Sequence, residues 1–122
     1  MSTDITGWIE VKVNDHWFGV IKLNYIIQRN YSMFDFLFGG RNDDYENAIA
    51  GQRLPLPEEM SREAEEDGIW ETWIGLDELL IIDWEEHEDV NFTDDWKRFI
   101  EMMKLVSQGE RVTDVRLVCS FF

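Results

Sequence analysis

The sequence predicts a single α+β domain in which an antiparallel sheet packs against a long C-terminal helix and shorter helices. Three observations indicate this fold class. Apolar and polar residues alternate near the N-terminus, apolar residues recur with helical spacing between residues 94 and 107, and the last eleven residues are strongly apolar. A chain of 122 residues can bury a core without disulfides or metal, so we expect one domain over residues 1–122.

The N-terminal segment predicts a β-hairpin. Residues Trp8–Val13 alternate between apolar and polar types, and His16–Leu23 are strand-forming residues throughout. Between them lies Asn14–Asp15, and both residue types tolerate the positive φ angles of a tight turn. In this hairpin we expect Glu10 and Lys12 on the solvent face, with the apolar side chains turned toward the core.

Two short helices are predicted before the middle of the chain. Asn30 is the expected N-cap of a helix over residues 31–38, which ends at Gly39–Gly40. Ser61 is the expected N-cap of an acidic helix over residues 62–67.

The middle of the chain contains its most apolar segment. Trp70–Ile74 is a candidate short strand, and the apolar spacing of Leu76–Trp84 predicts a helix of about two turns. The charged residues that follow, Glu85–Asn91, are expected to form a loop.

The C-terminal third predicts the longest helix and a central strand. Thr93 is the expected N-cap of a helix over residues 94–107, whose apolar stripe is Trp96, Phe99, Ile100, Met103 and Val106. Val112–Phe122 is apolar on both faces, as expected of a strand that lies between two others. We expect the sheet to combine this strand, the hairpin and the strand near Trp70, with the helices on one face.

Charge is the strongest functional signal in the sequence. The formal net charge is −15, and between Glu58 and Asp95 there are sixteen acidic residues and one basic residue, Arg62. Such a charge opposes binding to nucleic acid and to anionic membranes, because phosphate contacts need Lys and Arg. It favours solubility, which is the simplest reason for such acidity, and it also favours encounter with a basic protein. In the second case, acids grouped in this way can stand in for the phosphates of a duplex.

Twelve acidic residues of this segment are the predicted partner-binding residues. They are Glu63, Glu66, Asp67, Glu71, Asp77, Glu78, Glu85, Glu86, Glu88, Asp89, Asp94 and Asp95.

The sequence contains no pattern typical of an enzyme or a metal site. The acidic run Glu85–Asp89 includes His87, but it has neither the HExxH spacing of zinc enzymes nor the alternating acids of a calcium loop. The single cysteine, Cys119, lies in an apolar strand, where a thiol behaves as a small buried hydrophobe. We therefore expect no catalytic residue, no metal and no cofactor.

Five stretches, in this order, resemble a family of small acidic proteins carried by bacteriophages and prophages. They are Gly7–Lys12, Arg29–Asn42, Leu56–Glu63, Trp73–Trp84 and Val115–Val118, and together they cover about half of the chain. In that family a His-Ser pair often precedes the residue equivalent to Trp73. Glu71 and Thr72 stand there in this chain, so the resemblance carries over no catalytic residue.

The resemblance implies a phage accessory protein that inhibits host defence. Together with the acidity, it leads to the hypothesis of an anti-CRISPR-like inhibitor that binds a basic nucleic-acid-handling host protein, such as a CRISPR effector or another nuclease. Its expected location is the cytoplasm of the bacterial host. A single cysteine and the lack of a signal-peptide pattern at the N-terminus agree with this expectation.

Two alternative functions stay open at this point. The first is a phage accessory module that binds protein through the loop over residues 41–60 and exposed aromatic side chains, because long loops in small domains are often functional. The second is a protein that binds or hydrolyses a small signalling molecule, which requires a pocket lined by converging polar groups.

Overall fold

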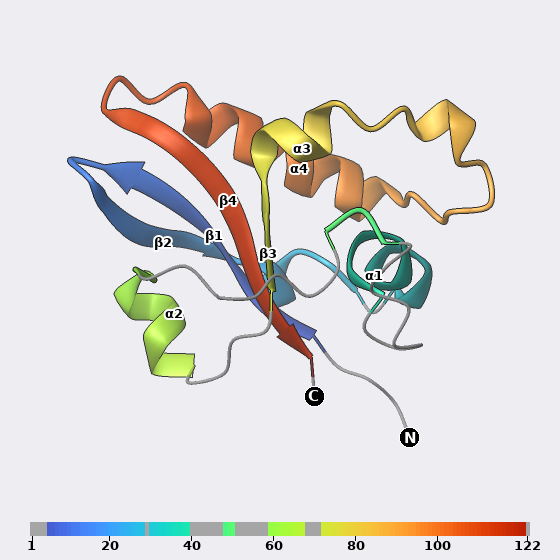
Figure 1. The fold of residues 1–122 in the computed structure, drawn as a ribbon, viewed down its shortest axis with the longest axis horizontal. Helices are drawn as coiled ribbons and strands as arrows, with labels where there is room; N and C mark the ends of the chain where they lie inside the picture. The colour runs from blue at the N-terminus through green and yellow to red at the C-terminus, as the bar shows by residue number, and fades with distance from the viewer. Residues whose placement is uncertain (1–4, 29, 40–47, 51–58, 68–71, 122) are drawn as a thin grey trace.

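The computed structural model describes residues 5–28, 30–39, 48–50, 59–67 and 72–121. Its strands are β1 (Ile5–Val13), β2 (His16–Lys22), β3 (Thr72–Gly75) and β4 (Val112–Phe121). Its α-helices are α1 (Tyr31–Phe38), α2 (Arg62–Asp67), α3 (Leu76–Leu80) and α4 (Asp94–Ser107), and its 3-10 turns are η1 (Leu23–Tyr25) and η2 (Trp84–Glu86). The strands form one antiparallel sheet in the order β2-β1-β4-β3, and Figure 1 shows β1 and β4 side by side at its centre.

The predicted α+β fold is confirmed, with the long helix α4 packed on the sheet. Four members of its predicted stripe, Trp96, Phe99, Ile100 and Met103, are buried. They join buried side chains of α1 and the inward residues of β1 and β4, and Phe34 of α1 meets Trp96 edge-to-face at a ring-centre distance of 6.1 Å. The helical period and the strand alternation thus meet in one core.

The hairpin and the central position of the C-terminal strand are also confirmed. Asn14 and Asp15 have φ angles of 51° and 64°, which match the turn to the twist of the strands. One bulge interrupts the pairing of β1 with β2, because Ile9 pairs with Ile21 while Glu10 pairs with Gly19. β4 pairs with β1 on one side and with β3 on the other.

The predicted starts of the helices have a clear local cause. The side chain of Asn30 accepts a hydrogen bond from the backbone N–H of Met33 at 3.2 Å, and the Ser61 hydroxyl accepts one from Ala64 at the same distance. α1 ends at Gly39, whose φ of 69° is the left-handed conformation that glycine favours.

The helix expected over residues 76–84 is shorter than predicted. α3 stops at Leu80, and Asp83 takes an extended conformation with ψ of 95°. The Asp83 side chain then accepts a hydrogen bond from the backbone N–H of Glu85 at 3.1 Å and starts the separate turn η2. A local side-chain bond therefore competes with continuation of the helix.

Two expectations about the faces of the sheet are wrong. Glu10, expected in solvent, is fully buried, and Lys12 beside it is half-buried. The helices also do not all cover one face, because α2 contacts β2 and β1 on the side opposite the core, next to Glu10 and Gly19. Residues 59–64 thus cover a surface that strand alternation alone assigns to water.

Two other predicted segments lie partly outside the described residues. Of the loop over residues 41–60, the structure describes residues 48–50 and 59–60, and the amides of Ile49 and Ala50 donate to carbonyl oxygens of α1. Of the strand predicted near Trp70–Ile74, residues 70 and 71 lie outside, and β3 covers the remainder together with Gly75.

Candidate functional site

The acidic residues predicted to bind a partner lie mostly along one continuous part of the chain. Residues 76–95 contain nine acidic residues and no Lys or Arg. We call this stretch the acidic surface; Figure 1 shows it running from α3 through η2 to the start of α4. Its exposed carboxylates belong to Asp77, Asp83, Glu85, Glu86, Glu88, Asp89 and Asp94.

The structure does not bring all twelve predicted residues together. Glu63 lies on α2, where its carboxylate accepts a hydrogen bond from the amide of Gly19 at 3.0 Å. Glu71 and the side chains of Glu66 and Asp67 lie outside the described part of the chain. The other eight predicted residues lie in the acidic surface, with Glu63 apart from it. The ninth acidic residue of this surface, Asp83, is not among the predicted residues.

Aromatic packing holds the acidic surface in shape. The rings of Trp84 and Phe92 stack at 3.9 Å between centres with an angle of 4° between their planes. Phe36 of α1 packs against Trp84 at 5.5 Å and against the imidazole of His87 at 4.7 Å. The exposed carboxylates of Glu85 and Glu86 thus stand on a backbone anchored to the core.

Hydrogen bonds from α1 and its N-cap also hold the part of the acidic surface that precedes α4. The side-chain amide of Asn30 donates to the backbone carbonyl oxygen of Asn91 at 2.8 Å. The backbone N–H of Asn91 donates to the Ser32 hydroxyl at 2.9 Å. The N-cap residue of α1 therefore also positions the loop before α4. A surface anchored in this way loses less conformational entropy when it binds a partner.

Two predicted residues, Glu78 and Asp95, have structural roles within the acidic surface. The Glu78 carboxylate accepts a hydrogen bond from the amide of Gly75 at 3.1 Å and closes the first turn of α3. Partial burial raises the pKa of the Asp95 carboxyl, but hydrogen bonds from the Thr93 hydroxyl and from two backbone amides outweigh it, so this pKa lies below its usual value. Asp95 thus stays ionised in the first turn of α4, whose N-cap residue is Thr93 as predicted.

The acidic surface also contains exposed apolar side chains and shallow hollows. Ile81 is 83% exposed and Leu80 is 48% exposed. A hollow of about 400 Å³ has Ile49, Ile81 and Ile82 among its walls, together with Glu78, Asp83, Glu86 and His87. A second hollow of about 340 Å³ lies between this segment and α4.

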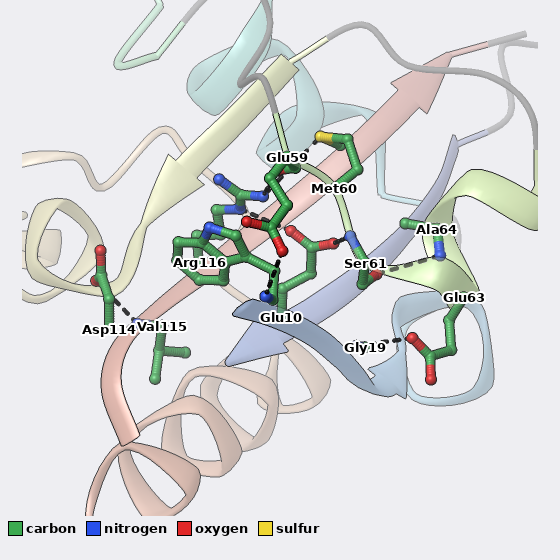
Figure 2. Close-up of polar contacts among 11 residues, drawn as sticks. Glu10, Gly19, Glu59, Met60, Ser61, Glu63, Ala64, Asp114, Val115 and Arg116 are labelled. Atoms are coloured by element: carbon green, nitrogen blue, oxygen red, sulfur yellow. Dashed lines mark hydrogen bonds and ion pairs between the residues drawn. The ribbon is translucent and has the colours of Figure 1, made fainter. Parts of the chain in front are cut away.

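A second polar cluster, which the sequence did not predict, lies on the other face of the sheet. Arg116 of β4 donates to the Glu10 carboxylate at 2.6 Å and to the carbonyl oxygen of Glu59 at 2.6 Å (Figure 2). The guanidinium lies 3.7 Å from the ring centre of Trp17, and the amide of Ser61 donates to Glu10 at 2.5 Å. Because its groups bond to one another, we interpret this cluster as the clamp that holds residues 59–61 on the sheet.

No local signal in the sequence predicts this clamp. Glu10 stands in an ordinary alternating strand, and its partner Arg116 lies 106 residues away in the chain. Only the pairing of β1 with β4 sets the two side chains opposite each other.

The described residues include no group of three or more His, Cys, Asp or Glu side chains placed to hold a metal ion. None of the helices that the structure describes is long and apolar enough to cross a membrane. Comparison of the chain with protein-family models, with curated protein sequences and with solved structures gives no match. The functional proposal therefore rests on the acidic surface and on the resemblance described above.

Proposed function

We propose that this protein is a non-enzymatic inhibitor that binds a basic nucleic-acid-handling protein through the acidic surface. The observation that carries the proposal is the anchored stretch of residues 76–95, which has nine acidic residues and no Lys or Arg. Exposed carboxylates on this anchored backbone group negative charge along one stretch of chain, as the phosphates of a nucleic acid do. A basic groove that releases its counterions to bind phosphate can do so for these carboxylates as well.

The proposed biological setting follows from the family resemblance. Phage and prophage accessory proteins of this size often inhibit host defence, and CRISPR effectors and other nucleases contain basic grooves for nucleic acid. We therefore place the protein in the cytoplasm of a bacterial host as an anti-CRISPR-like inhibitor. Its acidity supports a partner that is a protein rather than a nucleic acid.

The first prediction tests this function with purified CRISPR effector complexes in a DNA-cleavage assay. The test variant combines Glu85→Gln, Glu88→Gln and Asp89→Asn, which removes three exposed carboxylates from the acidic surface. Because each exposed charge pair contributes modestly, we expect the concentration for half-maximal inhibition to rise about tenfold. Inhibition by the unmodified protein should also weaken as salt is raised.

The matched control removes three exposed carboxylates elsewhere, with Asp15→Asn, Glu65→Gln and Glu110→Gln. Both variants have the same net charge, so only the position of the charge differs. Equal inhibition by the two variants would contradict the proposal, and so would failure to inhibit any effector. Inhibition that is insensitive to salt would instead favour binding through the loop over residues 41–60.

A further inference from the structure

The most exposed apolar side chain of the acidic surface has no role in the core. Ile81 is 83% exposed and follows the last residue of α3, while its neighbour Ile82 packs partly against the core. Apolar groups at the centre of a charged rim are typical of the anchoring part of a protein interface. Ile81 can therefore offer a partner an apolar contact in addition to the charge of the acidic surface.

Ile81 forms one wall of the 400 Å³ hollow, whose other walls are held in place. The amide of Ile49 donates to the carbonyl oxygen of Phe36 at 3.0 Å, so this wall is attached to α1. The Asp83 carboxylate is oriented by the amide of Glu85, and the ring of His87 packs on Phe36. Hydrogen bonds and ring packing therefore hold the walls of the hollow in place.

The chemistry of the walls favours one kind of occupant. Ile49, Ile81 and Ile82 offer apolar contact, while Glu78, Asp83 and Glu86 offer carboxylates around it. A nucleic acid or an acidic peptide is repelled by these carboxylates, and a small inorganic cation gains nothing from the isoleucines. A long side chain with an apolar stem and a cationic head satisfies both.

We propose that this hollow binds an arginine side chain that the partner presents next to an apolar residue. The arginine stem lies against Ile81 and Ile82, and the guanidinium faces Asp83 and Glu86 at the rim. Arginine fits better than lysine because its planar, weakly hydrated head donates up to five hydrogen bonds and tolerates an apolar surrounding. The inference rests on the proposed function, since it specifies how the acidic surface recognises a basic protein.

The second prediction uses three fluorescent peptides of equal length as probes. One alternates arginine with leucine, one replaces its arginines with lysine, and one replaces its leucines with serine. We expect the arginine–leucine peptide to bind most tightly when measured by fluorescence anisotropy. Its advantage over the arginine–serine peptide should persist at roughly 1 M salt, where the screening length falls to about 3 Å, because apolar contact is not screened.

Two changes in the protein separate the apolar from the charged contribution. Ile81→Ser removes no charge, and we expect it to weaken binding of the arginine–leucine peptide about tenfold at low and at high salt. The pair Asp83→Asn and Glu86→Gln should weaken binding at low salt and reduce its salt dependence. The asparagine keeps an oxygen that can accept from the amide of Glu85.

The control is Tyr25→Ser, because Tyr25 in η1 is 82% exposed and does not line the hollow. It should leave binding of all three peptides unchanged, and thermal unfolding should show that the Ile81 and Tyr25 variants fold equally well. Equal binding of the arginine–leucine peptide by Ile81→Ser and the unmodified protein overturns the arginine hollow. That result leaves the inhibitor proposal to the cleavage assay, whose variant changes no residue of the hollow.

Discussion

At the scale of single residues, the ion pair of Glu10 and Arg116 is notable because both of its charged side chains are buried. The side chains are 0% and 7% exposed, so both charges have lost nearly all of their water. The carboxylate recovers hydrogen bonds from Arg116 and from the amide of Ser61, and the guanidinium also stacks on Trp17. Such a pair adds little net stability, but loss of one partner leaves an uncompensated buried charge.

The third prediction is that Arg116→Met lowers the free energy of unfolding by about 3–5 kcal/mol, because the Glu10 carboxylate is left without its cation. Urea denaturation measures the loss. The comparison is Lys104→Met, since Lys104 pairs with Glu101 at 3.1 Å while both side chains stay exposed to solvent. For that exposed pair we expect a change of about 0.5 kcal/mol or less. Similar losses in the two variants would show that the buried pair is not a clamp.

Among the elements, α2 depends most on close contact with one glycine. A Cβ atom placed on Gly19 of β2 would lie 2.9 Å from the Cβ of Glu63 and 3.2 Å from the Ser61 hydroxyl oxygen. The amide of Gly19 also donates to the Glu63 carboxylate at 3.0 Å. The missing side chain at this position therefore lets α2 approach the strand and cover the clamp.

The fourth prediction is that Gly19→Ala forces α2 away from β2 and costs about 1–3 kcal/mol of stability. Hydrogen exchange provides the local measurement, because the amide of Ala64 donates to the Ser61 hydroxyl and should exchange faster when α2 shifts. Gly75→Ala is the control, since its nearest contact would be 3.4 Å from a flexible side-chain oxygen of Glu78. If both variants leave the exchange of Ala64 unchanged, the close contact at Gly19 does not govern the docking of α2.

At the scale of the whole molecule, two opposite electrostatic effects act on stability. The net charge of −15 makes the folded protein repel itself, and protonation of exposed acids relieves that repulsion. Protonation of Asp95 and Glu59 has the opposite effect and lowers the stability of the folded protein. A hydrogen bond from His16 is the main cause that lowers the pKa of Glu59. For Asp95, burial raises the pKa, but the hydrogen bonds from the Thr93 hydroxyl and two backbone amides outweigh it, so the pKa lies below its usual value.

The fifth prediction concerns the stability that Asp95 contributes as pH changes. Because its pKa is lower in the folded protein, the unfolded chain binds the proton more tightly, and the contribution is complete above the unfolded pKa of about 3.9. It is lost as pH falls through the folded pKa. Urea denaturation across this range should show the difference between the unmodified protein and Asp95→Asn shrinking as pH falls.

The comparison with Asp95→Asn isolates this carboxyl, because repulsion among the other acids is nearly the same in both proteins. The amides of Gln28 and Trp96 bond to different oxygens of Asp95, and asparagine keeps only one acceptor oxygen, so the variant retains one of the two bonds. The loss of the other bond lowers stability by an amount that does not change with pH. A difference in stability that stays constant from neutral to acidic pH would contradict the lowered pKa.

Much of the fold could be predicted because its cause lies within a few residues of chain. The stripe of α4 repeats with the helical period, and the Asn14–Asp15 turn needs only residues that tolerate positive φ. Asn30 reaches an amide three residues ahead, so its N-cap role is also local. The acidic surface could be located for the same reason, since its charge belongs to one continuous stretch of chain.

Contacts between distant segments decide three other features: the environment of Glu10, the position of α2 and the hollow at Ile81. Ser61 reaches Glu10 across 51 residues, and Ile49 joins Ile81 and Ile82 from another part of the chain. Alternation shows that Glu10 and Ile9 point to opposite faces, but it does not show what covers each face. Local patterns therefore determine where the helices and strands form. Tertiary packing determines which polar groups are buried and which apolar groups remain exposed, because burial depends on the segment that packs over a residue.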